Sequence, residues 1–213
     1  MASVDTAWES LKGRLTELEA LGGVVQLLEW DQQTMMPKGG GSQRGAQLST
    51  LTGIMHDRLA DPQVGSWLAA LCDETDPIKA ASVRNVQRDH ERATRVSTRL
   101  VAEIASASNS GFSAWLAARE ANDFSLFQSS VERLVELRKE EIACHGPADH
   151  PYDHLLEQYD PGSTTAQLQP MFARLKEELA AFIASVSGKE GPATVTGRWD
   201  IAGQEALSKS VID

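Results

Sequence analysis

The sequence lacks the features that would tie it to a membrane or to an oxidising compartment. No apolar run approaches the roughly 20 residues that span a bilayer. The N-terminus, MASVDTAWES, lacks the basic and apolar segments of a secretory signal. Cys72 and Cys144 are the only cysteines, too few to cross-link a chain of 213 residues. Reduced thiols and a cytoplasmic location are therefore expected, although one disulfide stays compatible with the sequence.

Basic residues are also scarce. Lys and Arg number 20 against 30 Asp and Glu, which gives a net charge of −10. The densest basic stretch, 84–99, is interleaved with Asp89 and Glu91, so no nucleic-acid partner is expected. Hydrophobic residues make up 41% of the chain and charged residues 23%, as in ordinary globular proteins. We expect 1–213 to form a single helical domain.

Helix signals recur along the chain, whereas strand signals barely appear. Thr6 and Glu9 form a capping box that opens the first helix. Gly22-Gly23 should kink or break this helix, and the helical pattern that resumes after them ends before Pro37. Asp61-Pro62 and Asp76-Pro77 are signatures of helix starts. Helices are expected over 42–60, from 61 as a short helix, and from 76 up to a break at 106–110. Further helices are expected over 112–121, 124–143, 164–187 and 201–212. A loop with a short extended piece at 193–196 is expected before the last helix. The fold class is therefore all-α, with about eight helices in an antiparallel, bundle-like array.

Three of the five histidines lie close together in the sequence, at His145, His150 and His154. On a helix, His150 and His154 would share one face and Asp153 could add a carboxylate, which is a geometry that zinc accepts. Pro151 favours the opposite interpretation, because it makes His150 an N-cap or pre-helix residue whose ring need not share a face with His154. We predict no metal site and retain His150 and His154 as the candidates.

Other patterns of catalytic residues are incomplete. The stretch His90-Glu91-Arg92-Ala93-Thr94 has Thr94 where a zinc-binding His-Glu-x-x-His helix needs its second imidazole, so it is interpreted as a solvated helix face. No Gly-x-Ser-x-Gly elbow and no phosphate-binding Gly-x4-Gly-Lys loop occur. Acidic pairs such as Glu140-Glu141 are also typical of a solvated face.

Several stretches resemble one family. The run 18–37, LEALGGVVQLLEWDQQTMMP, is similar to the start of the carboxypeptidase Taq family of thermostable zinc metallocarboxypeptidases. Similar stretches follow in family order, namely WLAAREANDF at 115–124, LVELRKE at 134–140, PYDHLLEQYDPG at 151–162 and QEALSKSV at 204–211. The fold implied is the N-terminal half of a zincin-like helical carboxypeptidase.

The resemblance implies a cytoplasmic, often dimeric peptidase that removes residues singly from peptide C-termini. In the complete family enzyme, two His and a Glu hold zinc, and a further Glu acts as the general base. The His-Pro-Phe, Asp-x-Arg-x-Thr and His-Glu-x-x-His motifs of the family do not occur in these 213 residues. No catalytic residue can be carried over, and no cofactor is expected in this chain.

What remains resembles the helical wall of the family's substrate groove. Trp30, Asp31 and Gln32 are candidates for groove or interdomain contacts, and core packing around a satisfied carboxylate is the alternative. Arg119 is a further candidate, which with Asn122 and Asp123 could form a hydrogen-bond network at a helix terminus.

Three functional hypotheses follow from the resemblance. The chain is a short relative, inactive alone, which binds peptide or associates with itself through an apolar surface. It is alternatively one piece of a complete carboxypeptidase, whose catalytic half is the missing partner. It is otherwise a helical module repurposed for protein interaction.

Overall fold

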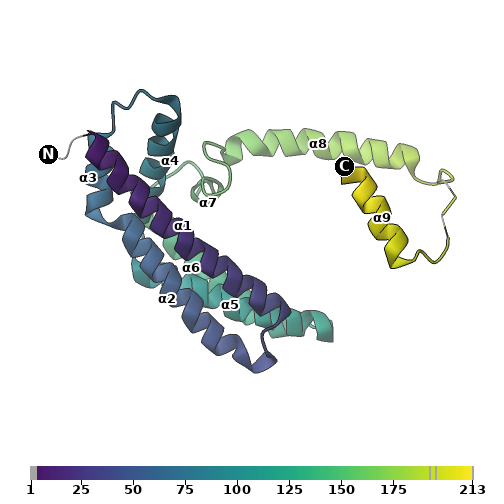
Figure 1. The fold of residues 1–213 in the computed structure, drawn as a ribbon. Helices are drawn as coiled ribbons and strands as arrows, with labels where there is room; N and C mark the ends of the chain where they lie inside the picture. The colour runs from purple at the N-terminus through teal and green to yellow at the C-terminus, as the bar shows by residue number, and fades with distance from the viewer. Residues whose placement is uncertain (1–3, 192, 195, 213) are drawn as a thin grey trace. The chain divides into compact units, whose positions relative to one another are not determined.

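A computed structural model describes residues 4–191, 193–194 and 196–212. These residues contain nine α-helices and one short 3-10 helix (Figure 1), and none of them is assigned to a strand, which confirms the all-α prediction. The helices are α1 (Val4–Thr34), η1 (Lys38–Gly40), α2 (Gly41–Ala60), α3 (Pro62–Ala70), α4 (Pro77–Ala93), α5 (Thr98–Ala121), α6 (Ser125–Cys144), α7 (Asp153–Leu156), α8 (Thr165–Val186) and α9 (Ile201–Ile212). No helix in these ranges combines the length and the apolar character that crossing a bilayer requires.

The chain divides into two compact units, Met1–Thr164 and Thr165–Asp213. The first contains the helices α1 to α7, and the second contains α8 and α9, of which no described residue is buried. The expectation of one domain over 1–213 stays a prediction. The extended piece expected at 193–196 includes Val195, which lies outside the described residues.

One end of the first unit is held by an apolar core between α1, α3 and α4. Its buried members are Ala7, Leu11, Val64, Leu68, Leu71 and Val83, with Trp8, Leu15, Trp67 and Val86 packed against them. Both predicted proline starts are correct: Asp61 Oδ1 accepts from Gln63 N at 2.9 Å, and Asp76 Oδ1 accepts from Ile78 N at 3.0 Å. These caps satisfy free amides at the starts of α3 and α4, the helices that supply Val64, Leu68 and Val83 to the core.

Helices α2 and α5 approach closely along a line of small residues with four-residue spacing. A Cβ on Gly45 would lie 3.1 Å from Asn109 Oδ1, and Ser49 Oγ donates to Ala102 O at 3.1 Å. The paired positions, read along α2, are Gly41 with Ser113, Gly45 with Asn109, Ser49 with Ala102 and Gly53 with Thr98. Because one number rises as the other falls, the two helices are antiparallel.

Two predicted helix boundaries are wrong at the first helix. Gly22-Gly23 does not interrupt α1, which is one helix from Val4 to Thr34. Each glycine costs about 1 kcal/mol relative to alanine in a helix, and packing against α2 offsets that cost, since a Cβ on Gly22 would lie 3.8 Å from Met55 Cε. Thr6 and Glu9 both lie inside α1 and so do not open it.

The long helix expected from 76 to 106–110 is in fact two helices. Helix α4 ends at Ala93, and Ser97 caps α5 by accepting from Leu100 N at 3.3 Å. The expected break at 106–110 is instead helical, and Ser110 Oγ donates back to Ser106 O at 3.1 Å within α5. The predicted turn at Asn122 is correct, and its φ of 51° ends α5 in the left-handed region.

Candidate functional site

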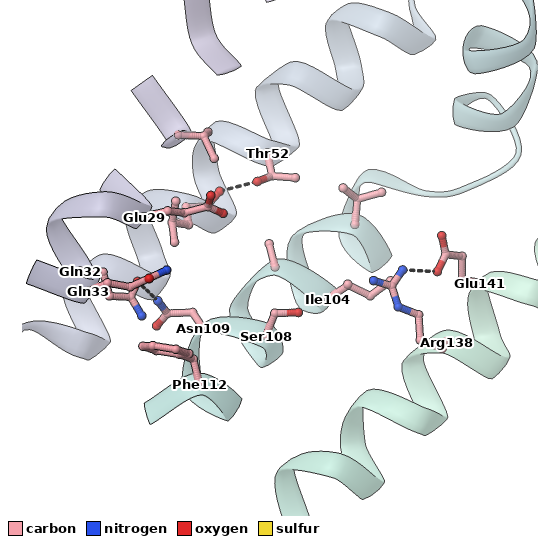
Figure 2. A pocket seen from close by; sticks show the side chains of 14 residues that line it. Glu29, Gln32, Gln33, Thr52, Ile104, Ser108, Asn109, Phe112, Arg138 and Glu141 are labelled. Carbon is pink, nitrogen blue, oxygen red and sulfur yellow. Dashed lines mark hydrogen bonds and ion pairs between the residues drawn. The ribbon is translucent and has the colours of Figure 1, made fainter. Parts of the chain in front are cut away.

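A hollow of the first unit lies between α1, α2, α5 and α6 (Figure 2). We call it the amide groove, and its volume is about 520 Å³. Polar and charged groups occupy its ends, with apolar side chains between them. The lining residues are Val25, Glu29, Gln32, Gln33, Leu48, Thr52, Val101, Ile104, Ala105, Ser108, Asn109, Phe112, Arg138 and Glu141.

Gln32, a predicted site residue, lies at one end of this groove. Asn109 Nδ2 of α5 donates to Gln32 Oε1 of α1 at 2.6 Å, and Figure 2 shows the two amides pointing toward each other. Asn109 is 7% exposed. The sequence analysis missed Asn109, although Leu100, Ile104 and Phe112 keep a four-residue step through the surrounding serines.

Asp31, beside Gln32, forms an ion pair. Arg44 Nη2 of α2 lies 2.5 Å from Asp31 Oδ2, and the same guanidinium donates to Leu28 O and to Gln47 Oε1. Arg44 is almost fully buried, so its charge is compensated by Asp31 inside the α1–α2 contact. The predicted alternative of a satisfied carboxylate is correct for Asp31.

Trp30 does not pack in a core. Its residue surface is 58% exposed, and Leu27 and Val24, one and two helical turns earlier, are 61% and 45% exposed. The spacing of three residues aligns these side chains on one face of α1. We call this the Trp30 face, and it is an apolar surface without a cover among the described residues.

The other end of the amide groove is charged. Arg138 Nη1 lies 2.6 Å from Glu141 Oε2, and Gln158 Nε2 donates to Glu141 Oε1 at 2.8 Å. Glu141 is buried, so the prediction that Glu140-Glu141 forms a solvated face is wrong for Glu141. The spacing of three residues between Arg138 and Glu141 is the sequence signal for this pair.

Arg119 lines a separate hollow of about 360 Å³ at the turn between α5 and α6, together with Trp115, Ala118, Asn122, Asp123, Phe124 and Phe127. Of the predicted helix-terminus network, the main-chain part is present: Asn122 N donates to Arg119 O at 3.3 Å, and Asp123 N donates to Ala118 O at 2.9 Å. Asp123 Oδ1 accepts from Ser125 N at 2.9 Å, and hydrogen bonds from Ser125 lower the pKa of that carboxyl. Arg119 is therefore not brought together with Trp30, Asp31 and Gln32.

The three clustered histidines have separate partners. His154 Nε2 bonds Gly146 O at 2.9 Å, and His150 Nδ1 accepts from Tyr152 N at 3.2 Å. His145 is buried, with its ring centroid 5.4 Å from that of His154. In the part of the chain that the structure describes, no three His, Cys, Asp or Glu groups converge in a way that could hold a metal. The residues present therefore do not fit the zinc that the resemblance implies.

His90 is also not on a solvated face, contrary to prediction. Its Nδ1 donates to Leu59 O at 2.7 Å, and its Nε2 would lie 2.9 Å from a Cβ placed on Gly65. The ring is buried between α2 and α3. A structural role therefore explains this histidine.

The amide groove offers both hydrogen-bonding and apolar contacts. Amide side chains such as Gln33 both donate and accept hydrogen bonds, as the main chain of an extended peptide requires. The apolar middle of the groove, with Ile104 and Phe112, can accept side chains of such a peptide.

Comparison with known proteins agrees with this fold. Residues 10–213 match the Carboxypeptidase Taq (M32) metallopeptidase family. Thermostable carboxypeptidase 1 of Thermus thermophilus is 33% identical over 198 residues, which are 86% of this chain and 39% of that protein. Carboxypeptidase 1 of Bacillus subtilis is 27% identical over 166 residues, 76% of this chain and 33% of that protein.

Solved structures give the same picture. The M32 carboxypeptidase from Deinococcus radiodurans R1 is 30% identical with a TM-score of 0.80, covering 97% of this chain and 42% of that one. A Pyrococcus furiosus carboxypeptidase, at 20% identity and a TM-score of 0.80, shows the shared fold alone. The chain thus spans less than half the length of the relatives it matches. By the family match over 10–213, the chain belongs to the carboxypeptidase Taq (M32) family of metallopeptidases.

Proposed function

We propose that these 213 residues form the helical wall of the peptide groove of a zinc metallocarboxypeptidase and hydrolyse no peptide by themselves. The observation that carries the proposal is the family match over 10–213 together with coverage of only 39% of the Thermus thermophilus relative. The catalytic residues then come from a further part of the fold. The free thiols of Cys72 and Cys144 support a reducing, cytoplasmic setting for this enzyme.

The amide groove supports the peptide-binding part of the proposal. Gln33 lines it, is exposed and lies next to the Gln32–Asn109 hydrogen bond. Its amide is therefore free to meet a peptide main chain, whereas Gln32 is held by Asn109. Gln26 lies two turns earlier on α1, is exposed and does not line the groove, which makes it a matched control.

Two apolar surfaces support docking of the catalytic part. The Trp30 face belongs to the first unit. In the second unit, α8 has a row of side chains that are between 42% and 62% exposed: Met171, Phe172, Leu175, Leu179, Phe182, Ile183 and Val186. Apolar surface of this extent on a helix is typical of an interface, and we infer that the rest of the carboxypeptidase fold covers it.

A chimera tests the proposal. The segment of the Thermus thermophilus carboxypeptidase that this chain matches is replaced by the chain, and release of C-terminal residues from a blocked dipeptide is measured with zinc. The chimera should be active. The chain alone should be inactive, and so should the Thermus thermophilus protein from which the matching segment has been deleted. Zinc-dependent release by the chain alone contradicts the proposal, and so does an inactive chimera that is folded and binds zinc.

The same chimera tests the amide groove. Gln33→Ala should raise KM about two- to tenfold with kcat little changed, because one hydrogen bond contributes about 0.5–1.5 kcal/mol. Gln26→Ala should leave KM unchanged. Equal effects of the two substitutions on KM would contradict the proposal that the amide groove binds peptide.

Self-association is the second candidate, and the exposed row on α8 favours it. Sedimentation of the chain alone should then show a dimer that dissociates when Phe172 and Phe182 are both replaced by Lys. A monomer at all concentrations contradicts self-association. The exposed row on α8 would then be assigned to contact with the catalytic part.

A further inference from the structure

A group of cationic side chains lies at the end of α4, remote from the amide groove's Gln32 end. Two hollows of about 290 Å³ and about 180 Å³ share Arg88, Arg92, His145 and Glu157 among their lining residues. Glu91, Arg95 and His154 line the smaller one as well. We call the smaller hollow the arginine hollow.

Three arginines meet where α4 ends. Arg88 and Arg92 are four residues apart, so they lie on one side of α4, and Arg95 follows its C-cap, Thr94. Asp89 and Glu91 interleave them in the sequence: Asp89 Oδ1 forms an ion pair with Arg88 Nη2 at 3.0 Å, and Glu91 lines the arginine hollow. A chain of net charge −10 thus gathers three guanidinium groups in one place.

Two of these guanidinium groups have no anionic partner. Arg92 Nη2 donates to His154 O at 2.8 Å, and Arg95 Nη1 donates to His145 O at 3.0 Å. Among the described residues, neither side chain forms an ion pair. Each therefore keeps further N–H donors available, since a guanidinium has five.

The nearby carboxylates are already engaged. Glu157 Oε2 accepts from Gly162 N at 2.8 Å, and Glu91 Oε1 accepts from Gln87 Nε2 at 2.5 Å. Glu141, which lines the larger hollow, is held by Arg138 and Gln158. These hydrogen bonds direct the carboxylates to partners other than Arg92 and Arg95.

The charges that shift the pKa of the buried His145 imidazole are mainly cationic. Burial is the main cause that lowers its pKa, and the charges of Arg92, His154 and Arg95 lower it further, whereas Glu141 alone opposes them. A positive potential in a confined hollow attracts anions.

We propose that the arginine hollow binds a phosphate group, either inorganic phosphate or a phosphate monoester. Guanidinium groups match the oxygens of phosphate with paired N–H donors. The hollow has a volume of about 180 Å³, well above what one water molecule needs. This is room for one phosphate group and a few waters.

Titration calorimetry on the 213-residue chain tests this site at constant ionic strength. Inorganic phosphate and glycerol 1-phosphate are titrated separately. At least one of the two anions should bind saturably, with one site per chain. The anion that binds more tightly shows whether the hollow prefers inorganic phosphate or a phosphate monoester. Arg92→Gln and Arg88→Gln should each weaken that binding at least tenfold.

Arg84→Gln is the matched control, because Arg84 is an exposed arginine one turn before Arg88 on α4 and lines neither hollow. It should leave the affinity unchanged. Arg88→Gln removes no hydrogen bond to the main chain, so it reports on binding even where Arg92→Gln perturbs the fold. Absence of saturable binding by both anions overturns the proposal, as does equal weakening by Arg84→Gln.

Discussion

Asn109 Nδ2 donates to Gln32 Oε1 at 2.6 Å and so joins two helices across 77 residues of sequence. This contact needs a continuous α1 up to Thr34 and a continuous α5 through its serines. The sequence predicted a break in each of these two helices. The same contact closes one end of the amide groove. The shape of the groove therefore depends on an amide pair that no local pattern contains.

Asn109→Ala should lower the free energy of unfolding by about 1–3 kcal/mol. The substitution removes a buried hydrogen bond and leaves Gln32 Oε1 without its donor. Urea unfolding followed by circular dichroism measures the change. Ser108→Ala, at the neighbouring position in the same groove, should change stability by less than about 0.5 kcal/mol. Equal stabilities of the two variants would contradict the structural role of Asn109.

Gly65→Ala should destabilise the protein by about 1–3 kcal/mol, although alanine favours helices. Its Cβ would lie 2.9 Å from Nε2 of His90, whose ring is fixed by the hydrogen bond to Leu59 O. Adding His90→Ala should relieve this overlap, so the two changes should couple by about 1 kcal/mol or more in a double-mutant cycle.

Gly13→Ala in α1 is the control for this cycle, because nothing lies within 4 Å of its Cβ. It should stabilise the protein by about 0.5–1 kcal/mol. A Gly65→Ala variant as stable as Gly13→Ala would show that His90 does not pack against α3 as described.

Gly23→Ala should raise the free energy of unfolding by about 1 kcal/mol, because Gly23 lies inside an unbroken α1 and its Cβ would meet nothing within 4 Å. Thermal and urea unfolding both measure this. A destabilised variant would indicate that the backbone at Gly23 is not helical, which is the break that the sequence alone predicted.

The elements fixed by local chemistry were predictable. Asp61-Pro62 and Asp76-Pro77 begin helices where expected, because cap and proline act within one turn. The glycines and serines of α1 and α5 were misinterpreted, because propensity is a weak term that packing between helices overrides. His90 and Glu141 were placed on solvated faces for a similar reason, since their partners, Leu59 O and Gln158, are 31 and 17 residues away.

The candidate site was predictable only in part. Gln32 lines the amide groove, and the resemblance to a family drew attention to it. Asn109 and Arg138 were missed, because a groove between four helices is defined by tertiary packing. Arg119 was selected from a stretch similar to the family, and it lines a different hollow.

The free energy of unfolding should fall between pH 7 and pH 5.5 in a way that depends on His145. Burial, with the charges of Arg92, His154 and Arg95, lowers the pKa of this imidazole below its ordinary value of 6.5. Below pH 6.5 the unfolded chain therefore binds a proton that the native chain excludes. Native stability is then fully present above about 6.5 and decreases as the pH falls toward the lowered pKa.

His145→Gln removes the titrating group, while the carbonyl that accepts from Arg95 remains. Its stability should depend less on pH than that of the wild type over this range, which lies above the ordinary pKa of carboxyl groups. Urea unfolding at half-unit pH steps measures both slopes in chloride buffers that contain no phosphate. Parallel slopes for the two proteins would mean that His145 accepts its proton as readily in the folded chain as in the unfolded one.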